Sequence, residues 1–265
     1  MDAARFRRIV WAHYKKHGRH HLPWRETRDS YRILVSEIML QQTQVDRVIP
    51  FYKYFIRKFG TAKKLAQAPL SEVLKAWQGL GYNRRAKMLQ AAAKELVRAT
   101  PISVEEWQKL PGVGPYTARA VSAFVSNEDV IVIETNIRTA VIHHFYPTRK
   151  KVSDALIEKA LIESLPLGKA REWYSALMDY GSHLKRSGVT HNKKSSTYTK
   201  QARFAGSLRE VRGSILRTLS MGPTTEKRLL AAFPKARAPQ LKTALTALLE
   251  EGFITKKDRS YQLAD

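Results

Sequence analysis

Apolar residues recur every three or four positions along most of residues 4–184. That period places them on one face of an α-helix, so it predicts a series of helical segments. They span residues 4–17, 30–46, 50–58, 71–77, 84–98, 116–126, 136–145, 153–164 and 169–184. Proline and glycine separate them, as at Pro23, Pro50, Gly79 and Pro101, and both residues interrupt helices. The pattern therefore predicts an all-α body with short connections.

The pattern changes after residue 186. Residues 187–206 are polar, basic and without a helical period, which is typical of a linker. Helical patterns return at 208–219, 224–233 and 238–250, and the sequence GFITKKDRSYQLA then favours two short strands around a basic turn. Three helices followed by a two-stranded wing are the outline of a winged helix over residues 207–265, whose third helix can enter a DNA groove. A small helical tail packed on the main body is the alternative.

The charge balance narrows the class of partner. The chain has 47 Lys and Arg against 23 Asp and Glu, a net charge of +24 over 265 residues. Such an excess favours nucleic acid, because neutralising phosphates releases counterions; a ribosomal-type or merely soluble basic protein is the alternative. The absence of cysteine excludes disulfides, thiolate zinc sites, iron–sulfur clusters and a cysteine nucleophile. With neither a membrane-spanning apolar stretch nor a signal peptide, we expect an intracellular protein of the cytoplasm or nucleoid.

A glycine-rich turn stands between two helical patterns at residues 107–119, WQKLPGVGPYTAR. Its spacing predicts a tight hairpin whose backbone N–H groups face an anion at the N-terminus of the helix near Pro115. A DNA phosphate is the natural ligand, and glycine at positions 112 and 114 lets the backbone approach it. An ordinary corner between two helices is the alternative.

Glu37 interrupts an apolar run, Ile33–Leu34–Val35 and Ile38–Met39–Leu40. Its side chain would therefore face an interior or a cleft. Burial raises the pKa of a carboxyl group, which keeps a proton available near neutral pH. From the pattern alone, a surface glutamate on the rim of a helix is the slightly better interpretation.

Together with the hairpin, PWR at 23–25, SEIMLQQTQV at 36–45 and GLGY at 79–82 resemble the helix-hairpin-helix superfamily of DNA glycosylases, and most of all the adenine-DNA glycosylases. The resemblance covers residues 20–184. It implies a mainly α, two-lobed fold, with a six-helix barrel and the hairpin at 25–130 and a second lobe from 1–24 and 131–186. It also implies base excision repair, in which the N-glycosidic bond of a flipped base is hydrolysed. That base would be adenine opposite 8-oxoguanine or guanine in duplex DNA.

The resemblance assigns catalytic roles to three residues. Glu37 would protonate the purine, and Glu134 would stabilise the positive charge on the sugar, with Tyr116 supporting them. The family has aspartate at position 134, and the extra methylene of glutamate moves the carboxylate by about a bond length, so impaired or altered activity is an open alternative. Tyr116 stands where endonuclease III has its Schiff-base lysine, so strand cleavage should be weak or absent. A packed aromatic is the other interpretation of Tyr116.

The remaining site residues also follow from the resemblance. Trp24, Arg25, Asn136 and Asp179 would line the base pocket. Gln41, Gln42, Thr43 and Tyr82 would fill or probe the stack at the flipped base, and Leu110, Gly112, Val113, Gly114 and Thr117 would contact DNA through the hairpin.

The chain departs from the family in two further respects. Lys185, Asn192, Ser195 and Gln201 stand where relatives have the four cysteines of an iron–sulfur cluster, and none can hold one. We therefore expect no cofactor other than a monovalent or divalent cation that the hairpin could bind. Residues 207–265 do not resemble the family's domain for 8-oxoguanine. We expect a monomer that binds double-stranded DNA with a mispaired or damaged base. A thymine, uracil or hypoxanthine mismatch glycosylase and a non-catalytic DNA-binding protein remain as alternatives.

Overall fold

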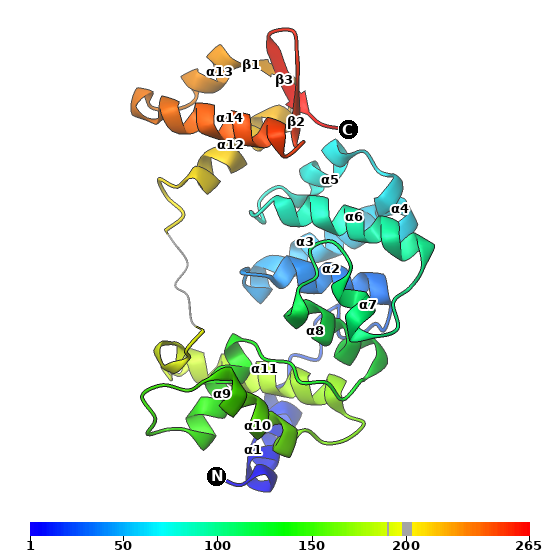
Figure 1. Cartoon of the computed structure of the whole chain (residues 1–265), viewed down its shortest axis with the longest axis vertical. Helices are drawn as coiled ribbons and strands as arrows, with labels where there is room; N and C mark the ends of the chain where they lie inside the picture. The colour runs from blue at the N-terminus through cyan, green and yellow to red at the C-terminus, as the bar shows by residue number, and fades with distance from the viewer. Residues whose placement is uncertain (190, 198–202) are drawn as a thin grey trace. The chain divides into compact units, whose positions relative to one another are not determined.

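The computed structural model describes residues 1–189, 191–197 and 203–265, and most of these residues are helical (Figure 1). The elements in the first part of the chain are α1 (Ala3–His17), α2 (Ser30–Leu40), α3 (Val45–Lys58), α4 (Ala62–Gln67), α5 (Leu70–Trp77), α6 (Arg84–Arg98), α7 (Val104–Gln108), α8 (Pro115–Ser126), α9 (Thr135–Phe145), α10 (Asp154–Ser164) and α11 (Ala170–Arg186). They are followed by η1 (Asn192–Lys194), α12 (Leu208–Ser220), β1 (Thr224–Thr225), α13 (Glu226–Ala231), η2 (Lys235–Arg237), α14 (Ala238–Glu250), β2 (Ile254–Lys257) and β3 (Ser260–Leu263). Within the described ranges, no helix has the length and apolarity needed to cross a membrane.

Two compact units make up the chain, and each combines separate stretches of sequence. Unit 1 comprises Met1–Glu37, Pro101–Lys109 and Val113–Lys200, and unit 2 comprises Ile38–Thr100, Leu110–Gly112 and Gln201–Asp265. This division differs from the predicted lobes, because α7 and α8 belong to unit 1 and the C-terminal elements belong to unit 2. The predicted lobes were drawn from the family resemblance, which does not extend to residues 207–265.

Unit 1 has its core where α11 packs against α1, α8 and α9. Phe6 and Trp173 are fully buried there, and their rings meet edge to face with centroids 5.9 Å apart. Gly181 of α11 lies directly against the start of α9, where a Cβ atom would collide with the backbone carbonyl of Asn136. Only glycine permits this approach, and it brings α11 next to the residues that begin α9.

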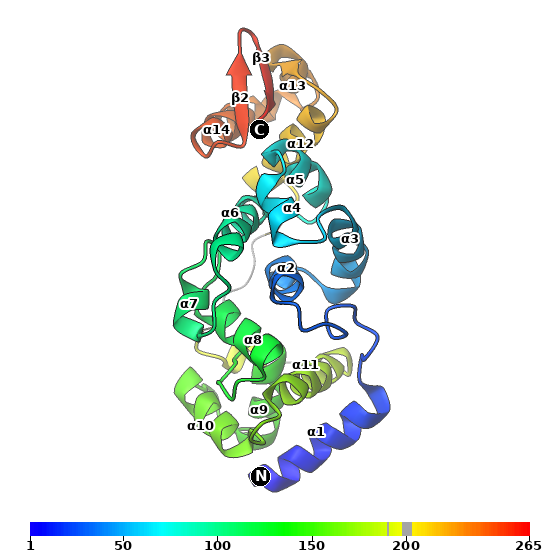
Figure 2. The same ribbon diagram turned by 90° about the vertical axis from the view of Figure 1, so that its right-hand side faces the viewer.

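Unit 2 contains the C-terminal elements, in which α12 packs against α14 and α5 (Figure 2). The strands form an antiparallel sheet in the order β1–β3–β2, with Thr224 opposite Tyr261 and Ile254 opposite Leu263. The predicted helix over 224–233 is wrong at its start, because residues 224–225 form β1. Thr225 then caps α13, since its hydroxyl accepts a hydrogen bond from the Arg228 backbone at 3.4 Å.

Two predicted boundaries between residues 40 and 50 are also wrong. Helix α2 ends at Leu40, and α3 begins at Val45 and continues through Pro50. Gln42 has a φ of +54°, which is incompatible with a right-handed helix, so the chain turns between the two helices. The apolar period continues across this turn and hides it. Pro50 costs α3 a backbone hydrogen bond without ending the helix.

Candidate active site

Glu37 lies on α2 with its side chain only 5% exposed. Glu37 is therefore buried, and it is not the surface glutamate on a helix rim that the pattern alone slightly favoured. Burial raises the pKa of Glu37 to about 7; a hydrogen bond from Tyr116 opposes the rise, and the charge of Glu134 adds to it. A carboxyl with a pKa near 7 is about half protonated at neutral pH, which suits a general acid.

Tyr116, in the first turn of α8, is the hydrogen-bond partner of Glu37. Its hydroxyl lies 3.4 Å from Glu37 Oε2. Burial and the negative charges of Glu37 and Glu134 raise the pKa of Tyr116 well above its ordinary value. The phenol therefore stays protonated and donates to the carboxyl, and it packs against the core of unit 1 at the same time.

Glu134 is the N-cap of α9. Its Oε1 atom accepts hydrogen bonds from the backbone N–H groups of Asn136 and Ile137, each at 2.8 Å. Its Oε2 atom accepts one from Asn136 Nδ2 at 3.1 Å. Burial raises the pKa of Glu134, while these backbone donors and the charges of Lys185 and Arg138 act in the opposite direction. The longer side chain thus still performs the capping that a shorter aspartate provides at helix N-termini.

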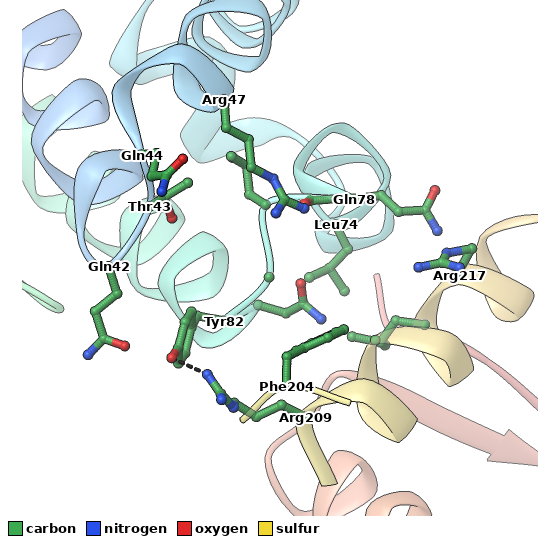
Figure 3. A pocket seen from close by; sticks show the side chains of 16 residues that line it. Gln42, Thr43, Gln44, Arg47, Leu74, Gln78, Tyr82, Phe204, Arg209 and Arg217 are labelled. Carbon is green, nitrogen blue, oxygen red and sulfur yellow. Dashed lines mark hydrogen bonds between the residues drawn. The ribbon is translucent and has the colours of Figure 1, made fainter. Parts of the chain in front are cut away.

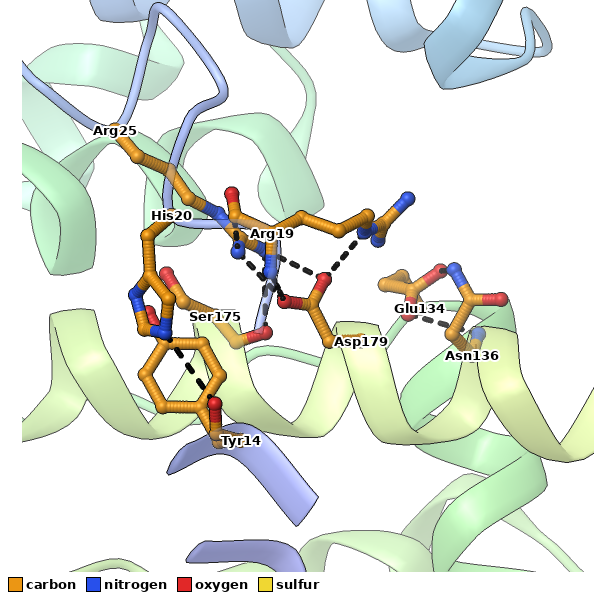
Figure 4. Close-up of polar contacts among 8 residues, drawn as sticks. All are labelled: Tyr14, Arg19, His20, Arg25, Glu134, Asn136, Ser175 and Asp179. Atoms are coloured by element: carbon orange, nitrogen blue, oxygen red, sulfur yellow. Dashed lines mark hydrogen bonds and ion pairs between the residues drawn. The ribbon is translucent and has the colours of Figure 1, made fainter. Parts of the chain in front are cut away.

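Asp179 is at the centre of a buried ion cluster with Arg19 and Arg25 (Figure 4). Its carboxylate accepts from Arg25 Nη1 at 2.7 Å, Arg25 Nη2 at 2.9 Å, Arg19 Nε at 2.6 Å and the Arg19 backbone N–H at 2.8 Å. Burial alone would raise the pKa of Asp179, but the two guanidinium groups hold it below its usual value. Because both oxygens already accept two hydrogen bonds, Asp179 is better placed to orient Arg25 than to bind a base itself.

The predicted catalytic and base-pocket residues all belong to unit 1. Trp24 is buried, and Arg25 also donates to the backbone carbonyls of Arg19 and Ser175. The amide of Asn136 is engaged at both ends: its Nδ2 donates to Glu134 and its Oδ1 accepts from Lys185 Nζ at 2.9 Å. Asn136 is therefore a direct partner of the Glu134 carboxylate.

The residues of the hairpin have different structural roles. Gly112 has a φ of +78°, and a Cβ atom there would lie 2.7 Å from Met88 Cβ, so the fold itself requires glycine. An added Cβ at Gly114 would meet nothing within 4 Å, so the fold itself does not require glycine at that position. Leu110, Val113 and Thr117 are buried, so their side chains hold the turn while the backbone faces solvent.

The predicted stack-probing residues, Gln41, Gln42, Thr43 and Tyr82, lie in unit 2. Gln42 and Tyr82 are both left-handed, with φ of +54° and +49°, a conformation that costs free energy in residues other than glycine. Gln41 Nε2 lies 3.5 Å from the carbonyl oxygen of Gly112. Strain at two predicted DNA-contacting residues is typical of functional sites.

Sequence reasoning missed Arg85, which holds these residues in place. The half-buried guanidinium donates to the Ile38, Met39 and Gln41 carbonyls at the end of α2, at 2.9, 2.9 and 2.6 Å. It also donates to the hydroxyl of Thr43 at 3.2 Å and to the carbonyl of Gly81 at 3.1 Å. Burial lowers the pKa of Arg85 to about 10, so the charge remains at the carbonyl end of the helix. Its place just after GLGY was the only sequence signal.

The positions that correspond to the cluster cysteines have other contacts here. Lys185 bonds Asn136, and Ser195 forms an isolated parallel β-bridge with Val152. Asn192 begins the short helix η1, and Gln201 lies outside the described residues. Over residues 1–189, 191–197 and 203–265, no three His, Cys, Asp or Glu side chains are grouped as a metal ion would require.

Comparisons with known proteins identify the family of this chain. A family model described as "HhH-GPD superfamily base excision DNA repair protein" matches residues 35–166. The chain is 36% identical over 263 residues to the adenine DNA glycosylase of Mycolicibacterium smegmatis, covering 90% of this chain and 89% of the relative. It is 37% identical over 182 residues to that of Buchnera aphidicola subsp. Baizongia pistaciae, covering 66% of this chain but only 50% of the relative.

Solved structures show the same fold. A thermostable thymine-DNA glycosylase superposes with a TM-score of 0.60 at 26% identity, covering 74% of this chain and 96% of that one. A trapped covalent intermediate of endonuclease III with DNA gives a TM-score of 0.56 at 22% identity, covering 71% and 87%. At that identity the second likeness concerns the fold alone.

Proposed function

The chain belongs to the HhH-GPD superfamily of base excision DNA repair proteins and is a DNA N-glycosylase, and from this premise we propose that it removes adenine from a mispair in duplex DNA. One observation carries the proposal: the Glu37 carboxyl is buried with the Tyr116 hydroxyl 3.4 Å away. Burial raises the pKa of Glu37 to about 7, so this carboxyl can protonate a purine as the purine leaves. The relatives named adenine DNA glycosylase support adenine as the base.

The reaction divides between two carboxyl groups. Glu37 donates its proton to the purine as the N-glycosidic bond breaks, and the Glu134 carboxylate stabilises the positive charge that develops on the sugar. Water then forms a bond to the sugar carbon, and its released proton returns to Glu37. Tyr116 orients Glu37 and cannot form an imine, so strand cleavage is weak or absent. All of these groups come from one chain, so the proposed enzyme needs no second subunit to complete the site.

A cavity of about 520 Å³ in unit 2 supports guanine or 8-oxoguanine as the opposite base (Figure 3). Arg47, Arg209 and Arg217 line it together with Tyr82 and Phe204. Arginine is the usual partner of the O6 and N7 edge of guanine, and aromatic faces can stack on a base. Arg209 donates to the Tyr82 hydroxyl, and its guanidinium centre lies 5.0 Å from the centroid of that ring. Helix α12 thereby contributes to the proposed opposite-base site.

A thymine or uracil mismatch glycosylase is the second candidate. The likeness to a thymine-DNA glycosylase structure at 26% identity favours it, and Tyr116 fits it equally well.

A single-turnover assay distinguishes these candidates. Duplexes carrying A, T, U or hypoxanthine opposite G or 8-oxoguanine are incubated with excess protein in EDTA, and abasic sites are then cleaved with alkali. We expect product from adenine duplexes, and a rate lower by at least about 10²-fold from the Glu37→Gln variant. Release of T or U instead would establish the second candidate. Tight binding without product from any duplex would indicate a DNA-binding protein that does not cleave. Strand cleavage without alkali, as fast as base release, would contradict the role of Tyr116.

We further propose that the C-terminal elements make a second contact with the duplex. The β2–β3 hairpin presents the exposed side chains of Lys256, Lys257 and Arg259, and the solvent-facing side of α14 includes Lys242 and Thr246. Lys87 donates to the carbonyl oxygens of Glu251 and Gly252, which anchors this region within unit 2. The basic hairpin fits the wing of a winged helix on a phosphate backbone.

Neutralising the charges of the β2–β3 hairpin should weaken DNA binding and should make the binding less dependent on salt concentration. For Lys256→Gln/Lys257→Gln we expect the slope of log Kd against log salt to fall by about 2, because each lost phosphate contact removes about 0.9. The rate at saturating protein should not change. Fluorescence anisotropy with an undamaged duplex measures the slope. The control is Lys63→Gln/Lys64→Gln, which removes two exposed charges from α4 of the same unit. An equal fall in both variants would show that net charge alone is responsible.

A further inference from the structure

We propose that Lys185 is a positioning residue that fixes the orientation of the Asn136 amide and, through it, the carboxylate of Glu134. Lys185 Nζ lies 2.9 Å from Asn136 Oδ1, and Asn136 Nδ2 lies 3.1 Å from Glu134 Oε2. The three side chains thus form a continuous chain of hydrogen bonds from α11 to the N-cap of α9. This inference rests on the proposed function, in which Glu134 stabilises the charge on the sugar.

The chemistry of the three groups allows one arrangement. An ammonium group only donates hydrogen bonds, an ionised carboxylate only accepts them, and an amide does both at opposite ends. Lys185 therefore requires the amide oxygen to face it, which turns the amide NH₂ toward Glu134. Without Lys185 the amide is free to flip, and its oxygen would then face the carboxylate and repel it.

The position of Lys185 on α11 follows from Gly181. Residues 181 and 185 are one helical turn apart, so they lie on the same face of α11. Gly181 lets that face touch the backbone of Asn136, and Lys185 then reaches its side chain. This contact joins α11 to α9 by a hydrogen bond between side chains.

The positive charge of Lys185 also stabilises the carboxylate of Glu134, in addition to orienting the Asn136 amide. It opposes the effect of burial, which raises the pKa of Glu134, and Arg138 also opposes it. Arg138, however, is paired with Asp154 through contacts of 3.1 and 2.7 Å, which offsets much of its charge. Lys185 itself is half-buried; burial lowers its pKa and the negative charge of Glu134 raises it. Lys185 thus adds to the two backbone N–H donors from Asn136 and Ile137, which also favour the ionised form of Glu134.

The test compares Lys185→Met with Lys185→Arg in the full chain. We expect Lys185→Met to lower the single-turnover rate on an adenine mispair by about 10- to 100-fold, the size of effect that a small misplacement of a catalytic group produces. Its Kd for the duplex should stay near that of the wild type. Arginine also only donates hydrogen bonds, so Lys185→Arg should recover most of the rate. The matched control is Arg186→Met, which removes a neighbouring exposed charge and should keep the wild-type rate.

Two further measurements separate positioning from general stability. In a Glu134→Gln background, Lys185→Met should cause almost no additional loss, because both changes remove the same effect. The carboxyl ¹³C shift of Glu134 should titrate at a higher pH in Lys185→Met than in the wild type, a readout that does not depend on activity. A wild-type rate in Lys185→Met, a full additional loss in the Glu134→Gln background, or an unchanged Glu134 titration would overturn the inference. A wild-type protein that releases no base from any duplex would instead contradict the proposed function.

Discussion

Replacing Glu37 by glutamine is expected to lower base release by about 10²- to 10⁴-fold, the contribution of a positioned general acid. Glutamine keeps the size of the side chain and its acceptor for the Tyr116 hydroxyl, but it has no proton to give to the purine. The rate is measured under single-turnover conditions with saturating protein. The Kd for the duplex should remain close to the wild-type value, because the buried side chain makes no contact with phosphate. A variant that retains more than a tenth of the rate would sink the assignment.

The pH dependence of the wild type provides the control for this result. Glu37 must be protonated to act, and its pKa is about 7, so the rate should fall about tenfold per pH unit above that value. The same raised pKa means that the folded state binds a proton more tightly than the unfolded chain. Its contribution to stability is therefore present at low pH and is lost as the pH rises toward 7. In Glu37→Gln the fall in rate above pH 7 and the loss of stability that Glu37 causes should both disappear. Thermal unfolding of this variant at pH 8 should therefore show no loss of stability relative to low pH.

Replacing Glu134 by glutamine is expected to lower the rate by about 10²- to 10³-fold, as removal of a preorganised electrostatic group does. The amide carries no charge to stabilise the sugar, and its NH₂ group would compete with the donors from Asn136 and Ile137. Single-turnover assays on an adenine mispair measure the loss. The control is Glu128→Gln, which changes an exposed glutamate six residues earlier in the same segment and should leave the rate unchanged.

The aspartate variant tests how the site uses its longer side chain. Aspartate caps helices well, so Glu134→Asp should keep α9 intact. Its carboxylate would lie about one bond length further back, so we expect no gain over the wild type. An increase in rate would show that glutamate at this position is a defect. A loss of less than about threefold in Glu134→Gln would show that the developing charge is stabilised elsewhere.

Much of the local structure was predictable because it depends on neighbours in the sequence. The helices near 4–17, 84–98 and 169–184 appear as α1, α6 and α11, since each carries an apolar stripe of sufficient length. The short helices α4 and α7 were missed because six and five residues give too few periodic positions. The turn after Leu40 was missed because Gln42 adopts a conformation that no propensity favours.

Glu37 shows how far local reasoning reaches within the site. Its place between apolar residues made a buried carboxyl one of two interpretations, and it did not reveal the Tyr116 hydroxyl, which comes from a helix 79 residues further along. Asp179 shows the limit more clearly. Its residue type suggested a base contact, whereas two arginines more than 150 residues earlier occupy both of its oxygens.

The sequence by itself determined the helical body, the glycine hairpin, the excess of positive charge and the exclusion of any site built on cysteine. These properties depend on residue type and on spacing over a few turns of chain. Only the tertiary structure decided that Arg85 binds the end of α2, that Arg25 and Asp179 are paired, and that Lys185 reaches Asn136. The physical reason is that a hydrogen bond between distant residues needs only one donor and one acceptor in the right place. It therefore leaves no periodic pattern along the chain, and packing alone determines which polar groups meet.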